Sequence, residues 1–265
     1  MEKVAEFHER GYCSLEGALD VELIDKLREE TLRNFDDCLS IIEQRELEFG
    51  VGIKHGFKEI VQRHEARFEM TYRMDELDRS FIEGKDSATR RLVEGILGED
   101  CQIVNMSAVV SLPGAKAQAW HSDGPHMSSI EHLPAHVLNV FIPLIPMTRA
   151  HGATEFRPKS HVMTRDLTTL FLAAAVKKRL EPLDAPLVGP GSAVLFDYRV
   201  LHRGLANTSG ERRPILVYTF AKPWYSDVLN FPKYSIDDEK IDRDDGDDGS
   251  GDDNVGDKDD GDGCV

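Results

Sequence analysis

The chain is poor in cysteine and has no long apolar run. Its 265 residues include four cysteines, at positions 13, 38, 101 and 264, and no two of them form a C-x-x-C pair. Zinc ribbons and redox motifs are therefore unsupported, and reduced thiols fit the pattern. The longest apolar stretches, such as residues 167–176, fall short of the ~18 residues that a membrane helix needs. We expect a soluble globular protein.

Targeting features are also lacking. The first six residues, MEKVAE, show neither the basic-then-apolar order of a signal peptide nor the Arg/Ser-rich character of a transit peptide. The last three residues, GCV, fit neither a peroxisomal address nor a prenylation signal. These absences favour a cytoplasmic location.

Basic charge is scarce as well. The formal net charge is −16, but 14 of the 48 acidic and three of the 32 basic residues lie in residues 236–265, so this segment carries −11 and the rest only −5. The segment has almost no apolar residue to bury. We therefore predict a folded domain over residues 1–235 and a disordered acidic tail over residues 236–265 that can contact basic partners. A near-neutral body without a basic stripe argues against nucleic-acid binding.

The spacing of apolar residues divides the domain into a helical part and a strand-rich part. Residues 20–49 predict a long helix, and residues 86–97 predict a second one that begins at Asp86 or Ser87 and ends at Gly98. Residues 50–74 show no clear pattern. Short β-branched and aromatic runs between turn signals predict six strands, over residues 103–112, 115–120, 137–145, 153–156, 193–198 and 215–221. One helix, over residues 166–180, is predicted among them. This order predicts an α+β protein with a jelly-roll (double-stranded β-helix) core and N-terminal helices packed outside it.

The sharpest local pattern is the pentapeptide WHSDG at residues 120–124. Residues two apart in a strand point to the same face, so His121 and Asp123 can direct an imidazole nitrogen and a carboxylate oxygen at one point. Two such ligands make half of a metal site. Taken alone, an H-x-D pair arises more often by chance or as a core hydrogen-bond pair, so the interpretation needs a further ligand.

A second block supplies a histidine and an arginine. Residues 207–210 read as a turn, and a hairpin about residues 207 and 208 would set His202 roughly opposite Arg213. A buried arginine needs an anion, and no carboxylate in this block obviously supplies one, so a bound dicarboxylate is a good candidate.

The neighbouring arginine is the alternative anchor. Arg212 and Arg213 point to opposite faces of the predicted strand. Arg213 is the preferred anchor because it lies on the same face of the strand as Ile215 and Val217, which are expected to point inward.

Together, His121, Asp123 and His202 form the two-histidine, one-carboxylate triad that suits non-heme Fe(II) and leaves three coordination positions open. With 2-oxoglutarate, the keto acid would take two of these positions and O2 the third. Arg213 would then pair with the distal carboxylate of 2-oxoglutarate.

With these residues in place, the chain resembles the phytanoyl-CoA dioxygenase-type members of the Fe(II)/2-oxoglutarate oxygenases. The similarity runs from near the start of the chain to about Trp224. It passes through FHERGY (7–12), LEGALD (15–20), WHSD (120–123), LNVFIPL (138–144) and GATEFRPKSH (152–161), and then through the His202 block and Arg213.

The resemblance implies that His121, Asp123 and His202 are iron ligands and that Arg213 anchors 2-oxoglutarate. It also implies that Phe141 lies near the co-substrate, because relatives often carry an aromatic residue there. The implied activity is hydroxylation of a C–H bond of a small-molecule substrate, with release of succinate and CO2.

Two positions depart from the family pattern. Lys159 stands where relatives commonly have glycine. Gly204 stands two residues after His202, where some relatives place a serine that helps to hold the 2-oxoglutarate carboxylate, so Arg213 has less help here. Relatives that halogenate replace the carboxylate ligand with a small residue, so the retained Asp123 disfavours halogenation.

Two rival functions remain. A jelly-roll metalloprotein could use the same ligands for zinc or manganese without 2-oxoglutarate, which would leave an inward Arg213 unexplained. A catalytically silent binding module could engage basic partners through the acidic tail, and the intact triad argues against it.

Several other residues have plain structural interpretations. Pro134, between His132 and His136, disfavours the helix that an i, i+4 metal pair needs, so these histidines and His126 are expected on a surface or pocket-rim loop. His161 is expected to hydrogen-bond a turn. The predicted determinants of substrate choice are the variable loops over residues 50–74, 124–136 and 162–188, which carry no acyl-CoA or amino-acid signature.

Overall fold

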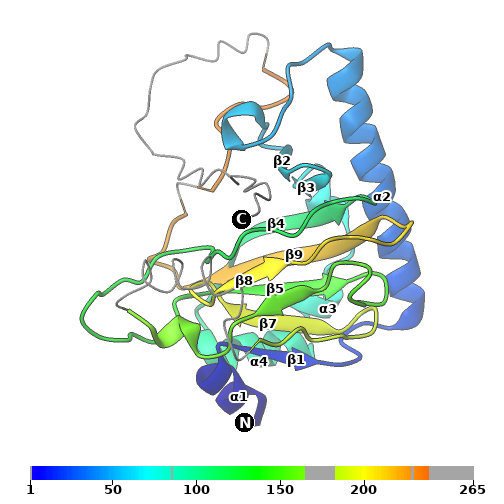
Figure 1. Ribbon diagram of the computed structural model, residues 1–265. Helices are drawn as coiled ribbons and strands as arrows, with labels where there is room; N and C mark the ends of the chain where they lie inside the picture. Colours follow the sequence, from blue (N-terminus) through cyan, green and yellow to red (C-terminus); the bar gives the residue numbers. More distant parts are fainter. Residues whose placement is uncertain (1, 85, 165–182, 228–229, 239–265) are drawn as a thin grey trace, which may run out of the picture.

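Two antiparallel sheets face each other across a cavity. The computed structural model describes residues 2–84, 86–164, 183–227 and 230–238. In this part of the chain the larger sheet has seven strands, which follow the spatial order β1-β7-β5-β9-β4-β3-β2 from the bottom to the top of Figure 1. Their bounds are β1 Tyr12–Leu15, β2 Ile60–His64, β3 Arg67–Met70, β4 Gln102–Ser111, β5 Val137–Pro143, β7 Ala193–Asp197 and β9 Arg213–Ala221.

The smaller sheet is short and forms the opposite wall. It pairs β6 (Thr154–Phe156) with β8 (His202–Gly204). Single bridges extend it on both sides, from His121 to His202 and from Phe156 to Asp184. This arrangement of two facing antiparallel sheets confirms the predicted jelly-roll core.

The two faces of the larger sheet differ in character. Side chains of successive strand residues point to opposite faces. In β5 and β9, Leu138, Val140 and Leu216 belong to the main hydrophobic core, whereas Asn139 and Val217 line the cavity. The alternation therefore separates a packing face from a cavity face within the same strands.

Helices cover the packing face. Helix α2 (Val21–Gln44) crosses the direction of the strands on one side of the sheet (Figure 1) and buries Leu27, Phe35 and Cys38 in the main core. Helix α4 (Ala88–Leu97) begins after Ser87, whose Oγ accepts from the Arg90 N–H at 3.1 Å, and ends at Gly98. The remaining helices are α1 Glu2–Arg10, α3 Ser80–Glu83 and the short 3-10 turns η1 Ile53–His55, η2 Met74–Glu76 and η3 Ser160–Val162.

One predicted strand is absent, and one unassigned stretch contains two strands. Residues 115–120 form no strand and run as irregular chain toward the cavity. The first β-bridge after them is the single one at His121. Residues 50–74, which showed no pattern, contain β2 and β3. The predicted helix over residues 166–180 lies outside the described residues.

The packed chain extends slightly beyond the predicted domain boundary at residue 235. Ile236 is 1% exposed within the main core, and its N–H donates to Glu59 at 2.9 Å. Arg45 donates to the Ile236 carbonyl at 2.8 Å. The rest of the predicted tail, residues 239–265, lies outside the described residues.

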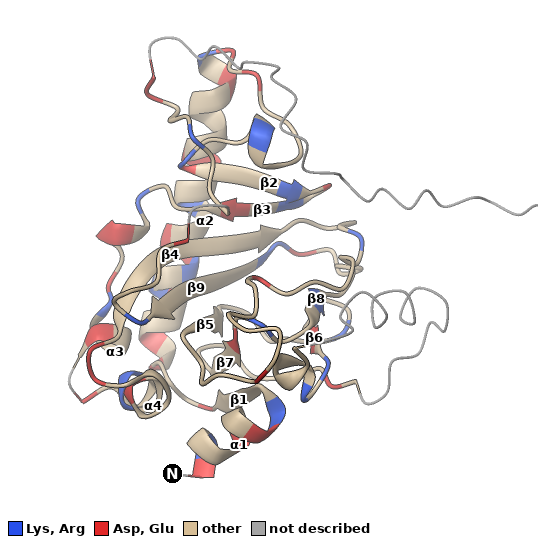
Figure 2. Cartoon of the chain, turned by 90° about the vertical axis from the view of Figure 1, so that its left-hand side faces the viewer, with Lys and Arg blue, Asp and Glu red and all other residues tan. Residues whose placement is uncertain are grey.

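The described part of the chain carries charges of both signs on its surface and has free cysteines in its interior. Figure 2 shows acidic and basic residues close together on α1, α4, β2 and β3. The three cysteines that fall within the described ranges, at positions 13, 38 and 101, are buried and unpaired. No helix in those ranges is long and apolar enough to cross a membrane.

Candidate metal and co-substrate site

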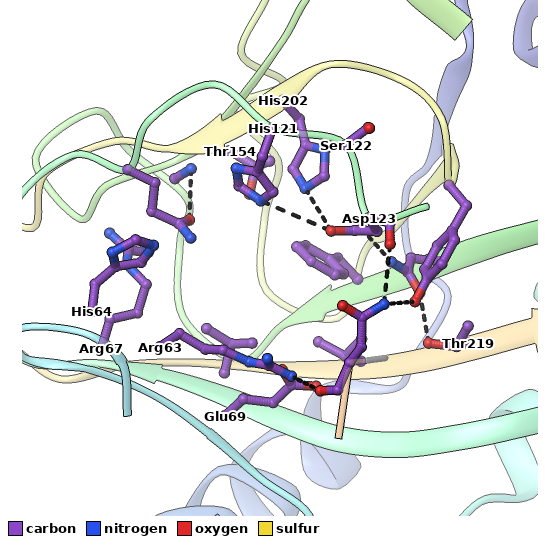
Figure 3. Close-up of a pocket in the computed structure, with 18 of the residues that line it drawn as sticks. Arg63, His64, Arg67, Glu69, His121, Ser122, Asp123, Thr154, His202 and Thr219 are labelled. Atoms are coloured by element: carbon purple, nitrogen blue, oxygen red, sulfur yellow. Dashed lines mark hydrogen bonds and ion pairs between the residues drawn. The ribbon is translucent and has the colours of Figure 1, made fainter. Parts of the chain in front are cut away.

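The three predicted ligands come together at the edge of the smaller sheet. His121 Nε2 lies 3.8 Å and His202 Nε2 lies 3.6 Å from Asp123 Oδ1 (Figure 3). Two backbone hydrogen bonds join His121 to His202, with N–O distances of 3.1 and 2.9 Å. One ligand atom from each of the three residues lies within 4.8 Å of the others, and they are the one such group in the described chain.

Backbone carbonyls orient both imidazole rings. Nδ1 of His121 lies 2.9 Å from the Ala119 carbonyl, and Nδ1 of His202 lies 3.1 Å from the Val200 carbonyl. Because a carbonyl oxygen only accepts, each Nδ1 must carry the hydrogen. In the neutral form of each ring, Nε2 is then the nitrogen with the free lone pair, and it lies on the side that faces Asp123.

Asp123 is held by a chain of hydrogen bonds across two strands. Asn139 Nδ2 donates to Asp123 Oδ2 at 2.7 Å, and the Thr219 hydroxyl donates to Asn139 Oδ1 at 2.6 Å. Asn139 and Thr219 are direct partners in the β5–β9 register. This support occupies Oδ2 and leaves Oδ1 directed at the two histidines.

Close backbone approach explains the glycine after Asp123. The N–H groups of Asp123 and Gly124 both donate to the Tyr198 carbonyl, at 2.9 and 3.1 Å. A Cβ atom at position 124 would lie 2.3 Å from the Tyr198 ring. Glycine is thus required for the turn that places Asp123.

The site opens into a cavity of about 310 Å3 between the two sheets. Its wall includes the triad, Arg213 and Phe141, together with polar side chains that sequence reasoning missed: Arg63, His64, Arg67, Glu69, Asn105, Gln118, Asn139, Tyr198, Thr219 and Asn230. Of the three predicted substrate loops, residues 50–74 supply four wall residues, whereas none of the described residues in 124–136 or 162–188 contributes.

Arg213 and Phe141 both reach this cavity. Arg213 is 2% exposed, and Phe141 packs edge-on against Phe196 with ring centroids 4.7 Å apart. Arg212 points the other way and pairs with Asp36 on α2 at 2.7 Å, so the predicted strand parity is correct.

The hairpin that suggested this pairing does not exist. His202 lies on β8, which pairs with β6, whereas Arg213 lies on β9, which pairs with β4 and β5. Asn207 explains the departure, because its side-chain amide donates to the carbonyls of Ser111 and Glu211 and turns the chain from one sheet to the other. The two residues share the cavity because the sheets face each other.

Two guanidinium groups are buried in this wall. Arg67 and Arg213 are each 2% exposed, and neither makes an ion pair with any described residue. Burial lowers the pKa of Arg67 to about 10, and burial together with the Arg67 charge lowers the pKa of Arg213 to about 9. Uncompensated positive charge at this depth favours an anionic ligand.

The imidazole at the mouth of the site is suited to bind a cation. Burial, followed by the nearby charge of His202, lowers the pKa of His121 to about 4. The ring is therefore neutral at pH 7, which is the form that coordinates a metal.

A polar chain borders the outer part of the cavity. Asn230 Nδ2 donates to the Asp123 carbonyl at 3.1 Å, and the Asn230 carbonyl accepts from Arg63 at 2.8 Å. Arg63 also pairs with Glu69 at 2.8 Å, and Glu69 accepts from the Ser107 hydroxyl at 2.9 Å. These contacts connect Asn230, which follows β9, to Arg63 on β2. The sequence pattern did not predict strand β2.

His136 and His161 have structural positions. His136 is 3% exposed and stacks on Trp224 with ring centroids 5.6 Å apart, so its predicted place on a surface or pocket-rim loop is wrong. His161 is buried, with Nε2 3.1 Å from the His8 carbonyl.

The donor set fits a non-heme iron. Two imidazole nitrogens and one carboxylate oxygen converge on one point, and the cavity leaves room on its open side. This donor combination with open positions is typical of Fe(II) oxygenases.

Comparison with known proteins identifies the family. The profile of phytanoyl-CoA dioxygenase (PhyH) matches residues 7–215. The chain belongs to the phytanoyl-CoA dioxygenase family. The match includes all three triad residues, Phe141 and Arg213.

Named relatives of the family are similar over part of their length. The protein "Dioxygenase af480" of Aspergillus fumigatus is 30% identical over 141 residues, which are 53% of this chain and 44% of that protein. The chain spans less than half the length of the curated relatives it matches.

Solved structures share the fold. EctD from S. alaskensis, crystallised with 2-oxoglutarate and 5-hydroxyectoine, has a TM-score of 0.61 at 17% identity, over 83% of this chain and 75% of EctD. The epimerase SnoN, in complex with Fe3+, alpha ketoglutarate and nogalamycin RO, has a TM-score of 0.55 at 15% identity, over 83% and 82%.

Proposed function

We propose that this chain is an Fe(II)- and 2-oxoglutarate-dependent dioxygenase that hydroxylates a C–H bond of a small-molecule substrate. His121, Asp123 and His202 hold the iron, and Arg213 binds the distal carboxylate of 2-oxoglutarate. The observation that carries the proposal is the convergence of the three ligand atoms within 4.8 Å in the wall of a cavity that also contains the buried Arg213, which makes no ion pair with a described residue.

The reaction balances with these components. Bound Fe(II) supplies the activation of O2, which the side chains alone cannot perform. One oxygen atom enters succinate as 2-oxoglutarate loses CO2, and the other becomes the hydroxyl group of the product.

The chain's own residues bind and orient the reactants. Arg213 fixes one end of the keto acid, and its planar fork suits a carboxylate. Phe141 and Val217 give the same cavity an apolar part of its wall, which limits the access of water. Asn139 keeps Asp123 turned toward the metal position.

The similar structures support the choice of co-substrate and substrate class. EctD and SnoN were each crystallised with the keto acid and with a small organic molecule. A cavity of about 310 Å3 lies at the small end of the range for ligand pockets, which also favours a compact substrate.

Anaerobic reconstitution tests the proposal directly. Fe(II) and 2-oxoglutarate added to the purified protein should produce a metal-to-ligand absorption band, and admission of O2 with a substrate panel should release succinate. Arg213→Ala should weaken 2-oxoglutarate binding on the order of 10²-fold, because each 1.4 kcal/mol is tenfold and the carboxylate loses its charged partner. Metal binding without any effect of 2-oxoglutarate would instead favour the metalloprotein alternative.

A further inference from the structure

The cavity holds one more buried guanidinium than the proposed function uses. Arg67 on β3 is as deeply buried as Arg213, and the Nε atom of each has no hydrogen-bond partner within the described chain. Arg67 donates from Nη2 to the carbonyls of Lys116 and Leu205, at 3.2 and 3.0 Å. Carbonyls fix its position but do not balance its charge.

Backbone contacts bring Arg67 and Arg213 to the same end of the cavity. Arg213 donates to the Gly152 carbonyl, and Arg67 donates to the Leu205 carbonyl. These two carbonyls belong to adjacent segments, because the Leu205 N–H donates to Ala153 at 3.0 Å. The guanidinium groups are therefore held by neighbouring pieces of backbone at the end of β6 and β8.

Gly204 makes room for Arg67. A Cβ atom at position 204 would lie 2.5 Å from Arg67 Nη1 and 2.7 Å from Gln118 Oε1. Only a residue without a side chain lets the guanidinium rest against the backbone at this point. Gly204 is two residues after His202, a distance of about 7 Å along an extended chain, which a five-carbon diacid can span.

The acidic side chains of the wall are already engaged. Glu69 pairs with Arg63 and accepts from Ser107. Asp123 faces the histidines and accepts from Asn139. Two adjacent buried cations thus lack a protein anion among the described residues, and a bound dicarboxylate would relieve their repulsion.

Resting on the proposed function, we propose that Arg67, which occupies the space left by Gly204, is a second co-substrate-binding residue that together with Arg213 clamps the distal carboxylate of 2-oxoglutarate.

The first test compares two ligands on the metal-loaded protein. Calorimetry under anaerobic conditions, with Fe(II) bound, measures the affinity for 2-oxoglutarate and for 2-oxopentanoate, which lacks the distal carboxylate. Arg67→Met keeps the apolar stem and removes the charge. It should weaken 2-oxoglutarate on the order of tenfold to a hundredfold and leave 2-oxopentanoate within about twofold. Arg212→Ala, one residue from Arg213 but turned outward, is the matched control and should bind both ligands like wild type.

The second test replaces the Arg67 guanidinium, which occupies the space beside Gly204, with a serine hydroxyl. Gly204→Ser should displace Arg67 and weaken 2-oxoglutarate. In the Arg67→Ala background the same serine should strengthen binding relative to Arg67→Ala alone, because its hydroxyl then fills the vacated space as a neutral donor. The effect of the serine thus changes sign between the two backgrounds. Thermal unfolding and Fe(II) affinity of each variant show that the site remains folded.

The outcomes separate the two proposals. Failure of wild-type protein to bind 2-oxoglutarate would overturn the proposed function itself. Normal wild-type binding with an unchanged Arg67→Met affinity would overturn only the role of Arg67. Equal losses for 2-oxoglutarate and 2-oxopentanoate would also overturn it, because they would show a general distortion of the cavity.

Discussion

Strands β5 and β9 have one face in the hydrophobic core and the other face in the wall of the cavity. On the packing face, Leu138, Leu216 and Phe220 lie in one core with the side chains of α2. On the cavity face, Asn139 and Thr219 form a hydrogen-bonded pair that reaches Asp123. Neighbouring residues of one strand therefore alternate between packing in the core and lining the metal and co-substrate site.

This difference teaches that stability and site geometry can be perturbed separately. The packing face is apolar and stabilises the fold mainly by removing surface from water. The cavity face carries the polar residues Asn139 and Thr219, which are fixed by hydrogen bonds that set direction more than stability. Substitutions on the two faces should thus fall into distinct classes.

The largest effect is expected for a ligand on the cavity face. Asp123→Ala removes the single carboxylate of the triad, so Fe(II) binding should be strongly weakened and turnover should fall to background. Its melting temperature without metal should stay close to wild type, because Asp123 is partly exposed. Full activity in this variant, measured as succinate release, would refute the assignment of the triad.

A substitution on the opposite face should show the reverse pattern. Leu216→Ala deletes a fully buried side chain and should lower the free energy of unfolding by about 2–5 kcal/mol. Fe(II) affinity of the folded protein should remain near wild type. Denaturant unfolding and metal titration of the same sample check both statements, and a large loss of metal affinity would show that the faces are coupled.

An intermediate effect is expected one step away from the metal. Asn139→Ala removes the donor to Asp123 Oδ2 and should weaken Fe(II) binding about 10–100-fold. Thr219→Val cuts only the outer hydrogen bond of the chain and should have a smaller effect in the same direction. Metal titration of both variants gives the comparison, and a larger loss for Thr219→Val would contradict the proposed order.

The triad could be predicted from the sequence because its parts are local or have a distinctive spacing. The H-x-D pair brings two ligands together within three residues, and the parity of β9 distinguishes Arg213 from Arg212. Helix caps were also readable, since Ser87 and Gly98 act over one turn.

Features that depend on contacts between segments distant in sequence could not be predicted from the sequence. Arg67 and Gly204 meet only because the chain brings β3 and β8 to the same cavity, so the glycine was interpreted as a loss of support for Arg213. The hairpin prediction failed for a similar reason, because buried hydrogen bonds from Asn207 send the chain into the other sheet.

The domain boundary shows the same limitation on a smaller scale. Ile236 begins a strongly acidic segment, and composition alone assigned it to the tail. Its side chain is buried in the main core, and its backbone is hydrogen-bonded to Glu59 and Arg45, which are distant in sequence.

The smallest effect should come from the end of the chain, where two truncations sharpen the comparison between packed and polar regions. Removal of residues 239–265 takes away a segment with almost no apolar side chain, so the melting temperature should change by less than about 1 °C. Removal from residue 236 onward also deletes Ile236 and its contacts with Glu59 and Arg45. Burial of such a side chain is worth about 1.5–3 kcal/mol, which corresponds to several degrees in a protein of this size. Thermal unfolding of the two truncated proteins, with the full chain as control, measures the difference. Equal melting temperatures would show that Ile236 does not stabilise the fold, and a large loss in the shorter truncation would show that the acidic segment itself docks on the domain.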